Sequence, residues 1–127
     1  MTPELATPKH IEDAIAWMAK RDIGPILPDM FSPVGYVVDG IAGLWLYLTG
    51  SSLAYLEFLV TNPDVAPVSR GVAQDMVIEA CLEHAKKEGC RTVMAPIARH
   101  DVLERALAHG FVVVARADLA ARPLGGV

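Results

Sequence analysis

The sequence predicts a single α/β domain in which a mixed β-sheet carries helices on both of its faces. Segments of strand length alternate along the chain with segments of helical periodicity. The predicted strands within residues 34–61 are apolar on both sides, so other elements must cover both faces of the sheet. A helix over residues 71–88 connects two predicted strands, and such a strand–helix–strand passage requires a parallel pair.

The N-terminal part of the chain predicts a short strand, a helix and a loop. Residues 1–7 leave room for one short strand. Thr7 can cap a helix and Pro8 suits its first position, where no amide donor is needed, so the helix is expected over residues 8–20. Prolines interrupt residues 22–33, which we expect to form a surface loop without a regular element.

The middle of the chain predicts an antiparallel meander. Its three strands are residues 34–38, 41–48 and 53–61. The Asp-Gly pair at positions 39–40 is typical of a two-residue hairpin turn. A Gly-Ser-Ser turn at positions 50–52 separates the second strand from the third.

The C-terminal part predicts a helix, a strand, a second helix and a last strand. The long helix over residues 71–88 stops at a glycine. A strand over residues 91–97 follows, and then a short helix over residues 101–109, capped by Asp101 and closed by another glycine. Residues 111–115 are expected to be the last strand, which gives the order β-α-loop-β-β-β-α-β-α-β.

Length and composition restrict the class of protein. A chain of 127 residues suits one domain, spanning residues 1–127. Hydrophobic residues make up 53% and charged residues 20%, which excludes a disordered or fibrous chain. The net charge of −4 lacks the basic character with which nucleic-acid-binding proteins replace phosphate counterions. We therefore expect no nucleic-acid partner.

No segment predicts secretion, membrane insertion or a metal site. Residues 1–10 lack a basic region followed by an apolar run, so they are not a secretory signal. The uncharged residues 40–56 are fewer than the roughly 20 that a spanning helix needs. Cys81 and Cys90 cannot form a disulfide framework, and we expect no metal site at the His-Asp pair at positions 100–101, because adjacent side chains rarely point at one target. We expect a cytoplasmic protein with reduced thiols and no metal.

The start of the long helix, Val68-Ser69-Arg70-Gly71-Val72-Ala73, has features of an anion site. Backbone amides at a helix start have no partner within the helix, and the helix dipole adds partial positive charge there. The small residues at positions 71 and 73 allow a phosphate to approach the backbone, and Arg70 adds a permanent positive charge. The segment therefore predicts a phosphate or pyrophosphate site.

Four segments, in this order along the chain, resemble the GNAT family of N-acetyltransferases. Residues 56–63 resemble the family's fourth strand and the Asn-Pro that ends it. Gly71-Val72-Ala73 fits the second half of its Gln/Arg-x-x-Gly-x-Gly/Ala loop, and residues 74–93 are similar to the helix and fifth strand that follow. Residues 103–111 resemble the fourth helix and the Gly-Phe after it. The resemblance covers residues 34–114 and implies a GNAT-like fold.

The resemblance also implies a reaction and a site. Acetyl-CoA would be the co-substrate, and a small-molecule or peptide amine would accept the acetyl group. Residues 68–73 would bind the pyrophosphate. The backbone of Leu59, Val60 and Thr61 would hydrogen-bond the pantetheine arm, which would enter where the fourth and fifth strands splay apart.

Glu57 lies at a fourth-strand position where some family members carry the general base. The attacking amine must be neutral, so a base or a chain of water molecules has to take its proton. Burial disfavours a charged carboxylate, so we expect a raised pKa for Glu57 within its apolar strand, which suits a base. The alternative is a solvated or ion-paired Glu57 on the outer face of the sheet.

Departures from the family pattern favour a second hypothesis. Val68 stands where the family prefers Gln or Arg, and Ala106 stands where it commonly has a tyrosine that protonates the leaving thiolate. The second hypothesis is a catalytically degenerate GNAT-like module that serves as an acyl-CoA-binding, regulatory or phage-particle assembly component. Under both hypotheses the exposed edge of the last strand would pair with a second copy, so a homodimer is expected.

Overall fold

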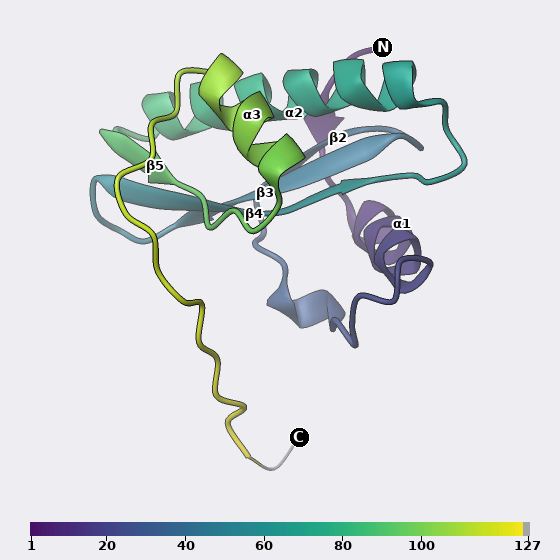
Figure 1. Ribbon diagram of the computed structural model, residues 1–127, viewed down its shortest axis with the longest axis horizontal. Helices are drawn as coiled ribbons and strands as arrows, with labels where there is room; N and C mark the ends of the chain where they lie inside the picture. The colour runs from purple at the N-terminus through teal and green to yellow at the C-terminus, as the bar shows by residue number, and fades with distance from the viewer. Residues whose placement is uncertain (126–127) are drawn as a thin grey trace. The chain divides into compact units, whose positions relative to one another are not determined.

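The computed structural model describes residues 1–125 (Figure 1). The chain falls into two compact units, Met1–Ala95 and Pro96–Val127, which are described one at a time. The first unit contains β1 (Glu4–Leu5), α1 (Pro8–Ala19), the 3₁₀ helix η1 (Pro28–Met30), β2 (Gly35–Val38), β3 (Ala42–Leu48), β4 (Leu53–Thr61), α2 (Pro67–Lys87) and β5 (Thr92–Met94). The second contains α3 (His100–Ala108). The single domain expected over residues 1–127 stays a prediction. None of the helices in the described part of the chain has the length and apolar character needed to cross a membrane.

The strands of the first unit form one sheet in the order β1-β2-β3-β4-β5. The first four strands are antiparallel to their neighbours, and β5 is parallel to β4. Val38 pairs with Ala42, so three residues, 39–41, connect β2 to β3, and the predicted two-residue turn is wrong. Gly40 adopts the positive φ of 74° that a three-residue hairpin loop places at its left-handed position. The predicted meander and the mixed sheet of an α/β fold are confirmed.

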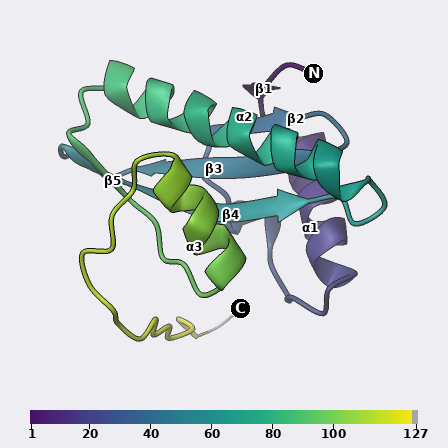
Figure 2. The same cartoon turned by 45° about the horizontal axis from the view of Figure 1, so that its top comes forward.

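α2 covers one face of the sheet (Figure 2). It contacts β2, β3 and β4, and its residues Val77 and Cys81 are 0% exposed. The thiol of Cys81 donates a hydrogen bond to the carbonyl of Leu44 at 3.6 Å. Burial raises the pKa of this thiol to about 12, so Cys81 serves as an apolar packing residue.

α1 and the loop after it cover the opposite face (Figure 1). The core on this side consists of Ala14, Trp17, Met18, Phe31, Val37, Trp45 and Val60. Trp45 is only 1% exposed, and its indole lies over two glycines. A Cβ atom on Gly43 would come within 2.9 Å of the indole, and one on Gly35 would overlap the indole Cδ1 and Nε1 atoms. The two glycines therefore provide the space that the Trp45 indole occupies.

Two elements of the first unit differ from the predictions. The loop expected over residues 22–33 contains η1, which begins at Pro28. Proline suits the first position of a helix because its missing amide would have no partner there. β5 ends at Met94 rather than at residue 97. Pro96 lacks the amide donor that a longer ladder needs, and it restricts the backbone of the residue before it.

The second unit corrects two further predictions. The N-cap of α3 is Arg99, so Asp101 is not the cap. The Arg99 guanidinium instead donates hydrogen bonds of 3.1 and 2.8 Å to the Asp101 carboxylate, which competes with capping. Residues 111–115 form no strand: Val112 and Val114 are 73% and 72% exposed, and no strand of the described chain pairs with them. A strand requires such a partner for its backbone hydrogen bonds.

Candidate functional site

β4 and β5 run side by side for a short distance and then part. Their parallel pairing joins Leu53, Ala54 and Tyr55 to Thr92, Val93 and Met94. β5 ends at this point, whereas β4 continues to Thr61. Within residues 1–125, no other strand pairs with the edge of β4 that β5 has left. This parting agrees with the splay that the family resemblance implied.

A β-bulge distorts β4 in the part that has left β5. Gly43 pairs with Val60 and Trp45 pairs with Glu57, so β4 has one residue more than β3 between these two pairs. Phe58 adopts a φ of 61°, in the left-handed region that bulky residues rarely occupy. The ladder is therefore interrupted at the point where β4 also lacks β5.

Glu57 lies beside the bulge, opposite Trp45. Partial burial raises the pKa of the Glu57 carboxyl, and a hydrogen bond with the Phe58 backbone partly opposes the rise. The expected direction of this pKa shift is confirmed. Burial also raises the pKa of Tyr47, with a smaller contribution from the negative charge of Glu57. The two side chains therefore share one partly desolvated environment.

One aromatic ring from the loop after α1, that of Phe31, packs against the bulge. The ring of Phe31 stacks on that of Phe58, with centroids 4.6 Å apart and planes 26° apart. The same ring meets Trp45 edge to face, with centroids 4.8 Å apart. The loop that the sequence marked only by its prolines thus contacts the strand that carries the candidate site.

Two of the three predicted pantetheine-binding residues already have ladder partners. Val60 and Thr61 pair with residues of β3, whereas Leu59 has no partner in β3 or β5. The Arg21 guanidinium, just beyond α1, donates hydrogen bonds to the carbonyl and hydroxyl of Thr61 at 2.5 and 3.0 Å. The end of β4 is therefore fixed by the chain itself, and of these three residues Leu59 is the one without a paired residue in β3 or β5.

α2 begins at Pro67 rather than at residue 71, so the predicted helix start is wrong. Residues 68–73 form its first turns instead of a loop, because proline at the first helical position favours the earlier start. The amides of residues 71–73 are used inside the helix, and that of Arg70 donates to Ala66 at 3.0 Å. No side chain caps this end, so the amides of residues 66, 68 and 69 have no hydrogen-bond partner among the described residues 1–125.

The side chains at this end of α2 point in different directions. Val68 is 81% exposed, so it lies on the open side of the helix. Ala73 is 0% exposed and belongs to the core on the α2 face. The small size of Ala73 therefore serves packing against the sheet, and the free amides of the first turn are the groups open to an anion.

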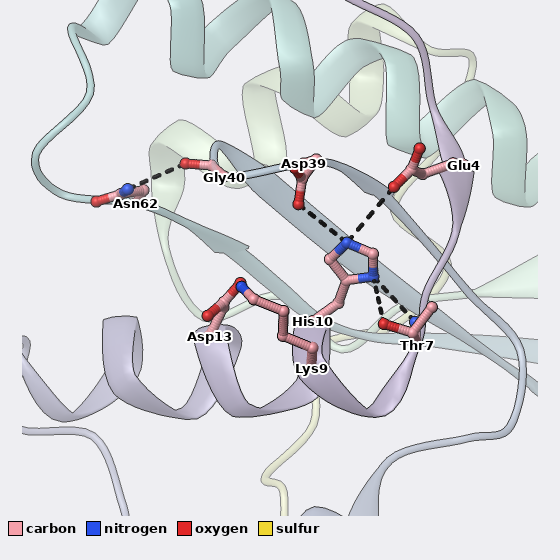
Figure 3. Close-up of polar contacts among 8 residues, drawn as sticks. All are labelled: Glu4, Thr7, Lys9, His10, Asp13, Asp39, Gly40 and Asn62. Carbon is pink, nitrogen blue, oxygen red and sulfur yellow. Dashed lines mark hydrogen bonds and ion pairs between the residues drawn. The ribbon is translucent and has the colours of Figure 1, made fainter.

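The structure also brings together Glu4, His10 and Asp39, with ligand atoms within 4.8 Å of one another (Figure 3). His10 Nε2 lies 3.1 Å from Asp39 Oδ1 and 3.5 Å from Glu4 Oε1. Spacing of this kind can hold a metal ion. Sequence spacing did not reveal this group, because its members belong to β1, α1 and the β2–β3 turn.

The hydrogen bond at the second ring nitrogen of His10, Nδ1, determines whether Nε2 is available to a metal ion. The amide of Thr7 donates a hydrogen bond to His10 Nδ1 at 2.9 Å, so Nδ1 is an acceptor (Figure 3). The proton of the neutral ring is then assigned to Nε2, which donates to Asp39 Oδ1 at 3.1 Å, while Glu4 Oε1 lies 3.5 Å away. A metal ion at Nε2 would need the lone pair that this proton occupies. The group fits a cap that ties the start of α1 to β1 and to the neighbouring turn.

Comparison with known proteins identifies the fold. No protein-family model matches the sequence, and no curated protein matches it. An acetyltransferase from Trypanosoma brucei is 14% identical with a TM-score of 0.70, over 94% of this chain and 98% of its own. The Mycobacterium tuberculosis protein Rv2747, solved with CoA, is 12% identical with a TM-score of 0.71, over 95% and 77%. The protein AAC(6')-Iy, solved with the bisubstrate analog CoA-S-monomethyl-acetylneamine, is 18% identical with a TM-score of 0.65, over 96% and 97%.

Proposed function

We propose that this chain, whose fold is that of the GNAT acetyltransferases, transfers the acetyl group of acetyl-CoA to an amine. The observation that carries the proposal is the edge of β4 that faces away from β3 over residues 56–61: no strand within residues 1–125 pairs with it there, and the bulge at Phe58 distorts it. Backbone groups along such an edge need hydrogen-bond partners. The amides of a pantetheine arm can supply them as an added strand would, and Leu59, Val60 and Thr61 would make these contacts.

The first turn of α2 supports the proposal at the other end of the co-substrate. Its free amides lie at the positive end of the helix dipole, and Arg70 adds a permanent charge. A pyrophosphate would bind these groups. We propose this pyrophosphate-binding role for residues 68–70, and Gly71 would contribute by leaving room beside the helix.

Glu57 would act as the general base. An amine nitrogen attacks the thioester carbon, a C–N bond forms, and the C–S bond breaks to release the thiolate of CoA. Glu57 would take the proton that the amine loses, directly or through water. No tyrosine follows Tyr55 in the sequence, and by the family resemblance Ala106 stands where the proton-donating tyrosine is common, so water or another donor would protonate the thiolate.

Binding of acetyl-CoA is expected, and Gly71→Glu is expected to weaken it by at least about tenfold. The added carboxylate repels the pyrophosphate, and each 1.4 kcal/mol of lost binding energy is a factor of about ten. Glutamate favours a helix more than glycine does, so the loss would not come from breaking α2. Isothermal titration calorimetry measures both affinities, and Gly71→Gln is the matched neutral control.

Release of free thiol in the presence of a panel of amines tests the transfer step. Thiol release above the background rate supports the transferase. The second hypothesis, a non-catalytic acyl-CoA-binding module, is favoured by Ala106 and Val68. Acetyl-CoA binding without thiol release for any amine would establish that module, and a chain that binds no acetyl-CoA would contradict both functions.

The acceptor class and the setting belong to the same proposal. We infer a small-molecule or peptide amine as acceptor, since AAC(6')-Iy shares this fold and was solved with an analog that joins CoA to an acetylated neamine. A cytoplasmic setting supplies acetyl-CoA and keeps both cysteines reduced. The homodimer was expected from the edge of a last strand that residues 111–115 do not form, so it stays a prediction without that basis, and a doubled mass in light scattering would reveal it.

A further inference from the structure

The backbone of Phe58 is the most unusual feature of the candidate site. A non-glycine residue in the left-handed region carries a conformational cost, and a bulky residue keeps this conformation only when its surroundings impose it. Phe58 sits at a φ of 61° in the middle of β4, where an ordinary strand residue would be extended. Some contact around Phe58 must therefore hold it there.

The ring of Phe31 is the contact best placed to hold Phe58. The two rings stack with centroids 4.6 Å apart, and an offset stack of this kind stabilises a pair beyond its buried area. Phe31 is 8% exposed, so its ring lies in the core rather than on the surface. The Phe31 ring also meets the Trp45 ring edge to face, and this contact fixes the Phe31 ring from a second side.

The chain around Phe31 is itself attached to the sheet. On one side, the Tyr47 hydroxyl donates a hydrogen bond to the carbonyl of Met30 at 2.8 Å. On the other side, the Ser32 hydroxyl donates to the carbonyl of Leu46 at 2.5 Å. Phe31 is thus held between two hydrogen bonds to β3, and it forms a fixed surface against which Phe58 rests.

The position of Phe58 determines how the rest of β4 meets its neighbours. The bulge takes up one extra residue, and Val60 then pairs with Gly43 and is buried in the core beside α1. Without the bulge the pairing would shift by one residue, and every later side chain would change face. Leu59 would then pair with a residue of β3 instead of lying in the bulge.

We propose that Phe31 is a positioning residue for acyl-CoA binding: its stack on Phe58 keeps the bulge that presents the edge of β4. This inference rests on the proposed function, since the edge is the place where the pantetheine arm would bind. Phe31 touches neither co-substrate nor acceptor in this scheme. It acts through Phe58.

The decisive experiment compares Phe31→Leu with Phe31→Leu/Phe58→Gly. Leucine keeps an apolar side chain but removes the stack, and we expect acetyl-CoA affinity to fall about 2- to 12-fold in calorimetry. Glycine adopts a positive φ without support, so the double variant is expected to regain an affinity within about twofold of the wild type. The double variant is expected to keep the lowered melting temperature of Phe31→Leu, because glycine at position 58 does not restore the lost packing. Trp17→Phe, in the same core, is the matched control that lowers stability and leaves affinity unchanged.

A general packing role would give a different pattern. Affinity would then follow melting temperature in all variants, and Phe58→Gly would weaken Phe31→Leu further. That result would overturn the proposal, as would a Phe31→Leu variant with wild-type affinity.

A spectroscopic measurement separates this inference from the proposed function. A positive φ brings the amide and Hα protons of residue 58 close, so their nuclear Overhauser effect is strong, and it weakens when the residue becomes extended. We expect this signal to weaken in Phe31→Leu without any ligand. If the wild-type chain binds no acetyl-CoA and the signal still weakens in Phe31→Leu, the proposed function is wrong, but Phe31 does hold the backbone of Phe58. An unchanged signal would overturn the positioning role.

Discussion

Replacement of Glu57 by glutamine is expected to lower the rate of acetyl transfer by about 10²- to 10⁴-fold, which is the usual contribution of a general base. Glutamine has nearly the same shape and keeps a hydrogen-bonding oxygen, but it cannot take a proton. Acetyl-CoA affinity should not change, because the proposed donor contacts come from the backbone of β4 and the first turn of α2. Thiol release measures the rate, and calorimetry measures the affinity.

The pH dependence of the wild-type rate gives a second signature of the same residue. A base works only when it is deprotonated, so the rate rises as pH rises through the pKa of Glu57. Burial places that pKa above the ordinary value of 4.5, and the midpoint of the rise moves upward with it. Glu57→Gln should lose this rise and keep the one that comes from deprotonation of the acceptor amine.

An exposed carboxylate provides the control for Glu57. Glu83 lies on α2 with 61% of its side chain exposed, so Glu83→Gln should leave both the rate and the pH profile unchanged. If Glu57→Gln transfers acetyl groups at the wild-type rate, the base must be another group or water, and the role assigned to Glu57 is wrong.

Removal of the Trp45 side chain is expected to cost about 3–5 kcal/mol of folding free energy. Trp45 is 1% exposed at the centre of the core beside α1. The space it would leave lies over Gly35 and Gly43, which have no side chains to move inward. Small domains have only about 5–15 kcal/mol of total stability, so Trp45→Ala would lower the urea midpoint severely or unfold the chain.

A substitution at Gly35 tests the same packing even if Trp45→Ala does not fold. Gly35→Ala alone should cost about 1–3 kcal/mol, because its Cβ overlaps the indole. Combined with Trp45→Leu, the same change should cost much less, since the overlapping atoms are gone. Gly35→Ala in a Trp17→Leu background is the control, and equal costs in all three backgrounds would contradict the packing described here.

Much of the first unit follows from local sequence signals. α1 begins at Pro8, and β4 spans Leu53–Thr61, both as expected, because each is bounded by a strong turn or cap. α2 carried two competing start signals, and proline at position 67 outweighed the small residues near Gly71. The short β5 and the missing strand over residues 111–115 depend on pairing partners, and a single sequence does not specify these.

The candidate site was only partly visible in the sequence. The position and raised pKa of Glu57 followed from a charged residue within an apolar strand. The bulge at Phe58 did not, because a left-handed turn of the backbone is normally marked by glycine, and here the marker is a phenylalanine held by a ring distant in sequence. The His10 group was missed for the same reason, since it joins three separate elements.

The deep placement of Cys81 gives the chain a practical property. Maleimides and similar reagents react with the thiolate form of an accessible cysteine. Cys81 is buried between the sheet and α2 and its thiol has a pKa of about 12, so it is neither accessible nor ionised. Cys90 is the partly accessible thiol, and it precedes β5. A fluorophore attached there would sit at the root of the strand that leaves β4, so the unmodified sequence already carries a labelling point for watching that edge in solution.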